Sequence, residues 1–158
     1  MREINVVING SDVRATVSDR LLLSDFIRDD QRLTGTHVGC EHGYCGSCTV
    51  LLDGASVRSC LTLAVQTDGH VIETVESLAV GADLHPIQEA FRLNHGLQCG
   101  FCTPGLLMTT LELARENREC SREEIRERLA GNLCRCTGYH HIVDAVEAAL
   151  RTGGRDDG

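Results

Sequence analysis

The chain has 158 residues, with 23 acidic against 15 basic side chains and a formal net charge of −8. This charge argues against a nucleic-acid partner, because neutralising phosphates requires clustered Lys and Arg. No run approaches the roughly 18–20 apolar residues of a membrane span, and the N-terminus has no apolar segment followed by a small-residue cleavage site. We therefore expect a cytoplasmic, unexported protein with one ordinary domain or two small ones.

The first half predicts a small mixed sheet of about five strands and one short helix. Strands are expected at 2–8, 12–17, 49–54, 56–66 and 70–75, with turns at Asn9-Gly10, Asp53-Gly54 and Asp68-Gly69. The helix is expected over 20–30, where Leu22, Leu23 and Phe26 keep helical spacing and Ser18 or Asp19 is available as its cap. A long loop rich in Gly and Cys, residues 33–48, completes this half, and a loop of this length is usually functional.

The second half has no strand signals and predicts four helices. The first starts with Pro86 and stops at Gly96, and the second opens with Thr103-Pro104. The third starts with a capping box from Ser121 to Glu124 and ends at Gly131. The fourth carries an apolar stripe over 142–150 with helical spacing.

The predicted fold class is therefore α+β, with a sheet domain followed by an all-α domain. The expected limits are 1–76 for the first domain, 77–83 for a linker, 84–150 for the second domain and 151–158 for a disordered tail. The helical half also resembles an internal duplication, because a cysteine pair followed by Thr precedes two of its helices. Folding the two copies together would bring both pairs to one end of the domain.

Nine cysteines are unusual for a chain of this length. In a reducing cytosol, metal binding or catalysis is a better explanation than disulfides. Eight of the cysteines form two sets of four, and Cys120 matches neither set. Two sites of four thiolate ligands each are therefore predicted, with Cys120 as an incidental thiol.

The first set has the spacing that is typical of plant-type [2Fe–2S] clusters, C-x4-C-x2-C with a distant fourth cysteine. Its members are Cys40, Cys45, Cys48 and Cys60. Glycines inside the loop supply the repeated turns and the close approach of backbone amides that a bridged di-iron core requires. We expect Cys60 to lie on a strand after a hairpin, where it closes the far side of the site.

The second set is less decisive, because C-x2-C with C-x-C also suits a tetrahedral zinc ion. Its members are Cys99, Cys102, Cys134 and Cys136. Each pair precedes a helix, whose positive N-terminal end would favour the extra negative charge of a reduced cluster. The same helix ends would also favour a zinc tetrathiolate, so the spacing alone leaves both metals open.

The motifs GCEHGYCGSC, QCGFCTPG and LCRCTGY, in this order, closely resemble the small iron–sulfur subunit of molybdenum hydroxylases, over essentially residues 3–150. This group includes xanthine dehydrogenases, aldehyde oxidoreductases and aerobic carbon monoxide dehydrogenases. The resemblance implies a β-grasp, plant-type ferredoxin-like domain, then a four-helix-bundle domain, each with one [2Fe–2S] cluster. It also implies a medium FAD-binding subunit and a large molybdopterin-binding subunit, arranged as a dimer of heterotrimers.

In this resemblance the first cysteine set holds the cluster nearer the flavin, and the second set holds the one nearer molybdenum. Gln98 and Cys136 would face the molybdopterin. The chain would then relay single electrons from molybdenum to FAD, with no catalytic residue of its own. The substrate of the whole enzyme would be an N-heteroaromatic or an aldehyde. Three alternative functions of the chain stay open: the same subunit in an aerobic carbon monoxide dehydrogenase, a free-standing two-cluster ferredoxin, and a zinc-stapled interaction module.

Overall fold

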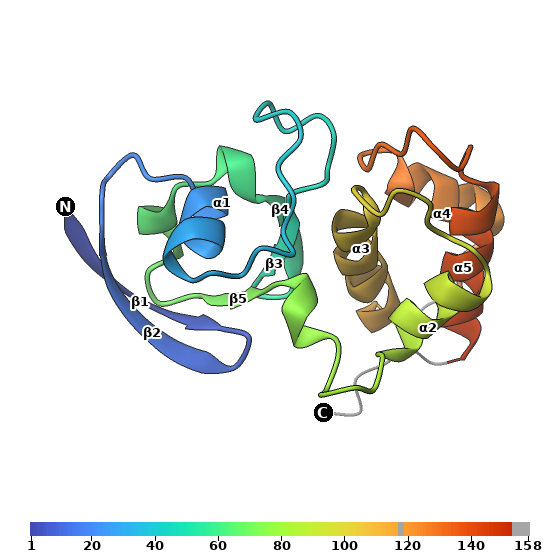
Figure 1. Cartoon of the computed structure of the whole chain (residues 1–158), viewed down its shortest axis with the longest axis horizontal. Coiled ribbons are helices and arrows are strands. Elements are labelled where there is room, and N and C mark those ends of the chain that lie inside the picture. The colour runs from blue at the N-terminus through green and yellow to red at the C-terminus, as the bar shows by residue number, and fades with distance from the viewer. Residues whose placement is uncertain (117–118, 153–158) are drawn as a thin grey trace.

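The computed structural model describes residues 1–116 and 119–152, and it has a sheet unit beside a helical unit (Figure 1). The strands are β1 (Arg2–Ile8), β2 (Ser11–Val17), β3 (Thr49–Leu52), β4 (Ala55–Arg58) and β5 (Val71–Glu73). They form one five-stranded sheet in the order β2-β1-β5-β3-β4, with β1 and β5 parallel and the other pairs antiparallel. The prediction of a small mixed sheet is confirmed.

Strand β3 links the two units because its neighbouring side chains point to opposite faces of the sheet. Val50 is buried in the core of the sheet unit, with Phe26 and Ile72. Leu51 points the other way, into the core of the helical unit, with Leu106. One strand therefore contributes to both hydrophobic cores, and the helix α3 packs directly on the sheet (Figure 1).

Two expectations for the sheet half are wrong. The short helix consists of α1 (Leu23–Asp25) and a π-helical turn over Phe26–Asp30, and neither Ser18 nor Asp19 caps it, since its N-cap is Leu22. The expected strand over 56–66 ends at Arg58, and 3-10 turns follow over Ser59–Leu61 and Ala64–Thr67. Cys60 thus lies on a 3-10 turn instead of a strand, and from this turn its thiol interacts with Cys48.

The described helices of the second half are α2 (Pro86–Leu93), α3 (Thr103–Arg115), α4 (Arg122–Leu129) and α5 (His140–Arg151). Pro86 lies in the first turn of α2, and Pro104 lies in that of α3, as expected from the missing N–H of proline. The predicted capping box of α4 is present, with Ser121 Oγ accepting from Glu124 N and the Glu124 carboxylate accepting from Ser121 N. No helix of the described residues is long and apolar enough to cross a membrane.

The stop after α2 works differently from the prediction. His95, and not Gly96, has the left-handed backbone, with φ of 53°. A Cβ on Gly96 would lie 3.0 Å from the Phe91 ring and 3.1 Å from Ala145, so this glycine allows α2 and α5 to pack closely. At the C-terminus, Arg151 ends α5 and so does not belong to the expected tail, whose residues 153–158 lie outside the described part.

The backbones of the two units approach each other closely at Gly105, in the first turn of α3. A Cβ there would lie 2.2 Å from the carbonyl oxygen of Gly46, a backbone atom that cannot move aside cheaply. Replacing Gly105 by Ala raises helix propensity by about 1 kcal/mol, but forcing an extra methyl group into a packed site costs about 1–3 kcal/mol. We expect Gly105→Ala to lower the free energy of unfolding, measured by urea denaturation; an increase would contradict the close contact.

Candidate iron–sulfur sites

The cysteine-rich loops of both units lie toward the same end of the molecule, at the top of Figure 1. The loop 33–48 precedes β3, the loop 94–102 precedes α3, and the loop 130–139 precedes α5. The structure therefore assembles two cysteine sets, one inside the sheet unit and one where the two helical loops meet.

In the first set the strongest interactions join the thiols two by two, with a weaker interaction between Cys60 and Cys40 across the set. Cys40 interacts with Cys45, and Cys48 interacts with Cys60. The second pair is buried and the first is partly exposed, so the set has an inner and an outer side. Gly43 has a positive φ of 72°, and a Cβ on it would collide with the Leu61 side chain at 2.2 Å. This glycine lets the loop fold tightly against the 3-10 turn that carries Cys60.

Backbone amides surround the outer thiol of this set. The N–H groups of Cys45 and His42 both donate to Cys40 Sγ at 3.4 Å, and they lower the pKa of the Cys40 thiol to about 6. Burial instead raises the pKa of the Cys60 thiol to about 11, and its contact with Cys48 adds to this effect. A bound metal reverses the preference of a buried thiol, because a coordinating thiol is deprotonated outright.

The second set also consists of two pairs, each with one member from each helical loop. Cys99 Sγ and Cys136 Sγ are 3.5 Å apart, and both residues are exposed. Cys102 is buried and interacts with Cys134, which is partly exposed. The expectation that the duplicated loops bring their thiols to one end of the helical unit is confirmed.

Hydrogen bonds hold the C-x-C loop in place. Burial raises the pKa of Cys134, but the hydroxyl and N–H of Thr137 and the N–H of Cys136 outweigh it, so the pKa is lowered overall. Burial raises the pKa of Cys102 to about 12. The Tyr139 hydroxyl accepts from Cys134 N at 2.8 Å and donates to the carbonyl of Asn132 at 3.2 Å, and so fixes the loop from behind.

The arrangement in pairs fits the donor set of a bridged di-iron core, in which each iron takes two protein ligands. The described residues contain no three Cys, His, Asp or Glu side chains grouped as ligands of a single metal ion. Directly after Cys102, the buried hydroxyl of Thr103 lacks a hydrogen-bond partner among the described residues. A buried hydroxyl usually has a partner, and a cluster bound at Cys102 would supply an acceptor for it.

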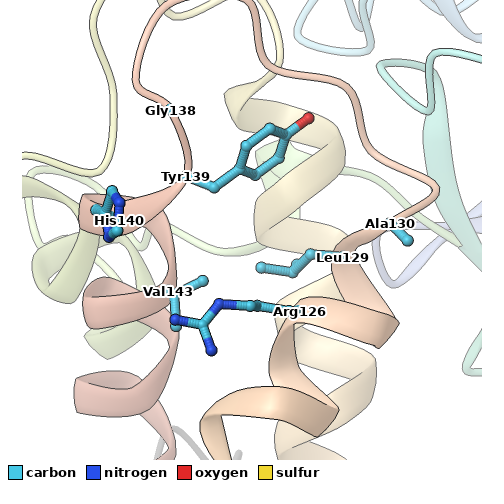
Figure 2. Close-up of a pocket in the computed structure, with 7 residues that line it drawn as sticks. All are labelled: Arg126, Leu129, Ala130, Gly138, Tyr139, His140 and Val143. Carbon is cyan, nitrogen blue, oxygen red and sulfur yellow. The ribbon is translucent and has the colours of Figure 1, made fainter.

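A cavity of about 370 Å³ lies behind the same loop, between α4 and α5 (Figure 2). Figure 2 shows Arg126 and Leu129 of α4 facing Val143 of α5, with Tyr139 above them. The full lining is Arg126, Leu129, Ala130, Gly138, Tyr139, His140 and Val143. No thiol or carboxylate lines it, and the thiols on which the iron–sulfur assignment rests lie outside it.

Comparisons with known proteins define the class. A model described as "2Fe-2S iron-sulfur cluster binding domain" matches residues 6–79, and one described as "[2Fe-2S] binding domain" matches residues 74–147. The chain therefore has two [2Fe–2S] binding domains. The second match identifies the helical unit as an iron–sulfur domain, which the cysteine spacing alone left open against zinc.

The relatives narrow the class to one family. The chain is 55% identical over 152 residues to the gamma subunit of caffeine dehydrogenase from Pseudomonas sp. strain CBB1, covering 94% of this chain and 91% of that subunit. It is 55% identical over 144 residues to the small subunit of nicotine 6-hydroxylase from Paenarthrobacter nicotinovorans, covering 91% and 87%. The crystal structure of quinoline 2-oxidoreductase from Pseudomonas putida 86 superposes with a TM-score of 0.94 at 50% identity, covering 99% and 98%.

This chain belongs to the family of small iron–sulfur subunits of molybdenum hydroxylases. The family predicted from the three cysteine motifs is confirmed. In these enzyme families, partner subunits carry the molybdenum cofactor and FAD.

Proposed function

We propose that this chain relays single electrons from a molybdopterin-bearing subunit to an FAD-bearing subunit through its two cysteine sets. Each [2Fe–2S] cluster, when bound, accepts and releases one electron. The ligands would be Cys40, Cys45, Cys48 and Cys60 in one set and Cys99, Cys102, Cys134 and Cys136 in the other. The observation that carries this assignment is that four thiols interact with one another in each set, with Cys99 Sγ 3.5 Å from Cys136 Sγ in the second.

The exposed pair of the second set supports a partner at that end of the molecule. Cys99 and Cys136 are exposed, and so is Gln98 next to them. Three large apolar side chains are exposed on the same loops, and a partner that covered them would remove apolar surface from water: Leu97, Phe101 and Leu133. We infer that the molybdopterin-bearing subunit covers this surface, with Gln98 and Cys136 facing the pterin.

The first set would face the flavin subunit. Its outer thiols are partly exposed, and Tyr44 and Leu61 beside them are exposed apolar side chains. A subunit that covered them would exclude water from the Cys40 side of the site. The assembly would be a cytoplasmic dimer of heterotrimers, in keeping with the reduced thiols that both sites require.

The proposed domains follow the family. The sheet unit would be a β-grasp, ferredoxin-like domain over 1–76, and the helical unit a four-helix bundle over 84–150, with 77–83 as the linker. Support comes from the strand order around a short helix, and from the four helices that share one core. The 3-10 turn that ends at Ser77 and the start of α2 at Pro86 bracket the linker.

The substrate would be an N-heteroaromatic compound or an aldehyde, oxidised by the large subunit. Relatives named for caffeine, nicotine and quinoline support the first class, and a relative named aldehyde oxidoreductase supports the second. This chain contributes no catalytic residue to that reaction. Its thiols and amides hold the electron carriers in place.

Metal and size analysis of the native protein tests the proposal. We expect about four irons and four acid-labile sulfides per chain, two for each [2Fe–2S] cluster, in a complex with two other subunits. Zinc in place of iron would contradict the proposal in favour of a zinc-stapled module. A monomer that carries both clusters would instead indicate a free-standing ferredoxin.

A further inference from the structure

The two units meet at a buried polar junction that lies between the two cysteine sets. One hydrogen bond connects the sets almost directly: the N–H of Leu133 donates to the carbonyl oxygen of Cys45 at 2.8 Å. Cys45 belongs to the first set, and Leu133 immediately precedes Cys134 of the second. A path of covalent bonds, interrupted only by this hydrogen bond, therefore runs from Cys45 of the first set to Cys134 of the second.

Asn132, next to Leu133, holds this contact from inside the protein. Asn132 is only 2% exposed. Its Nδ2 donates to the Gly46 carbonyl at 3.1 Å and to Thr49 Oγ1 at 3.4 Å, and its Oδ1 accepts from Thr109 Oγ1 at 3.0 Å. One amide thus joins the cluster loop of the sheet unit to helix α3 and to the C-x-C loop.

Arg58 reinforces the same contact from the sheet side. Its guanidinium donates to Thr49 Oγ1 at 2.7 Å and to the Gly131 carbonyl at 2.8 Å. The fixed fork geometry of arginine allows both bonds at once. The loop backbone is also closely packed here, because a Cβ on Gly46 would lie 2.1 Å from the Gly131 carbonyl oxygen. The Cys45 carbonyl and the Leu133 amide are therefore held together by contacts on both sides.

Buried amide side chains are costly unless their hydrogen bonds are satisfied, and those of Asn132 are. An apolar residue would fill the same space without that requirement. The bonds of Asn132 have a direct effect on geometry: they fix the register of the Leu133 amide against the Cys45 carbonyl. Electron tunnelling falls off less steeply through bonded atoms than across a gap between surfaces, so this register affects the rate of transfer.

We propose that Asn132, supported by Arg58, is a positioning residue for electron transfer between the two cysteine sets. The inference rests on the proposed function and adds the residues that set the coupling between its two centres. One electron at a time crosses the junction, from the side of the molybdenum subunit to that of the flavin subunit. No bond forms or breaks, and no proton moves.

The experiment uses the purified complex with all its subunits and compares wild type with Asn132→Ala. After full reduction with dithionite, electron paramagnetic resonance measures the spin–spin splitting between the two centres. Rapid-freeze samples after substrate addition then show how far reduction of the first centre lags behind reduction of the second. We expect Asn132→Ala to keep both signals and full iron content, to lose part of the splitting, and to show a several-fold longer lag.

Arg58→Lys is the second variant, in case Asn132→Ala does not assemble. It keeps the positive charge but loses the fork to Thr49 and Gly131, so a smaller change in the same direction is expected. Ser56→Ala is the matched control, because Ser56 also bonds across the two units, through its N–H and Oγ to the Glu112 carboxylate, away from the thiols. This control should leave both the splitting and the lag unchanged.

Three results would overturn the proposal. The first is an unchanged splitting and lag in Asn132→Ala with both centres filled. The second is an equal change in Ser56→Ala, which would indicate a general loosening between the units. The third is loss of iron from both Asn132→Ala and Arg58→Lys, which would make the junction a folding element. A wild-type complex with fewer than two signals would instead contradict the proposed function.

Discussion

Replacing Cys136 by Ser is expected to stop electron transfer out of the molybdenum subunit while the first centre stays intact. Cys136 and Cys99 form the exposed pair of the second set, so the substitution removes one of the two thiolates proposed for one iron. Serine is a poor replacement because iron–sulfur clusters select soft thiolate ligands. The measurement is substrate turnover of the complex with an artificial acceptor that takes electrons at the flavin, together with the electron paramagnetic resonance signal of the first centre.

Cys120→Ser is the control for this variant. Cys120 lies outside both sets, is partly buried and packs against the core of the helical unit. Turnover and both signals should stay close to wild type. Normal turnover in Cys136→Ser would show that electrons bypass the second set, and the proposed order of the two centres would then be wrong.

Replacing Phe91 by Ala is expected to cause the largest loss of stability in the helical unit. The chain has only three phenylalanines, and Phe91, 1% exposed, packs against Gly96 between α2 and α5. Truncating a buried Phe costs about 3–5 kcal/mol, out of a total stability of about 5–15 kcal/mol for a typical domain. We expect the urea midpoint of the helical unit to fall sharply, and the second centre to lose iron before the first.

Leu93→Ala, in the same helix, is the matched control. Leu93 is 62% exposed, and a surface substitution of this kind changes stability by less than about 0.5 kcal/mol. Equal losses in both variants would mean that helix propensity, and not the core around Phe91, determines the stability of this unit.

The helical half was predictable because its signals are local. Pro86, Pro104 and the Ser121–Glu124 capping box each act within one turn of helix, and all three are where the sequence predicts them. The role predicted for Gly96 was wrong because it was inferred from a local signal alone. A glycine after a helix usually supplies a left-handed backbone, but here Gly96 also lies against Ala145 of α5, a tertiary contact that no local pattern indicates.

The cysteine sets were predictable from spacing, but their pairing was not. Which thiol lies beside which depends on how the loops fold, and the path of Cys60 was wrong because the bend after Arg58 is set by packing, not by strand propensity. The junction formed by Asn132 and Arg58 could not be predicted from the sequence either. Its hydrogen bonds join Asn132 to residues more than 80 positions away, such as Gly46 and Thr49, and a lone Asn or Arg in a sequence does not reveal such partners.

On the proposed function, two separate di-iron sites on this chain each hold a single electron. Titration of the complex with its own substrate, followed by electron paramagnetic resonance at each step, tests it most directly. We expect two distinguishable signals that each grow to one unpaired electron per chain, with half of the total iron in each centre. A single signal at full reduction, or substrate turnover in a preparation that never shows either, would contradict it.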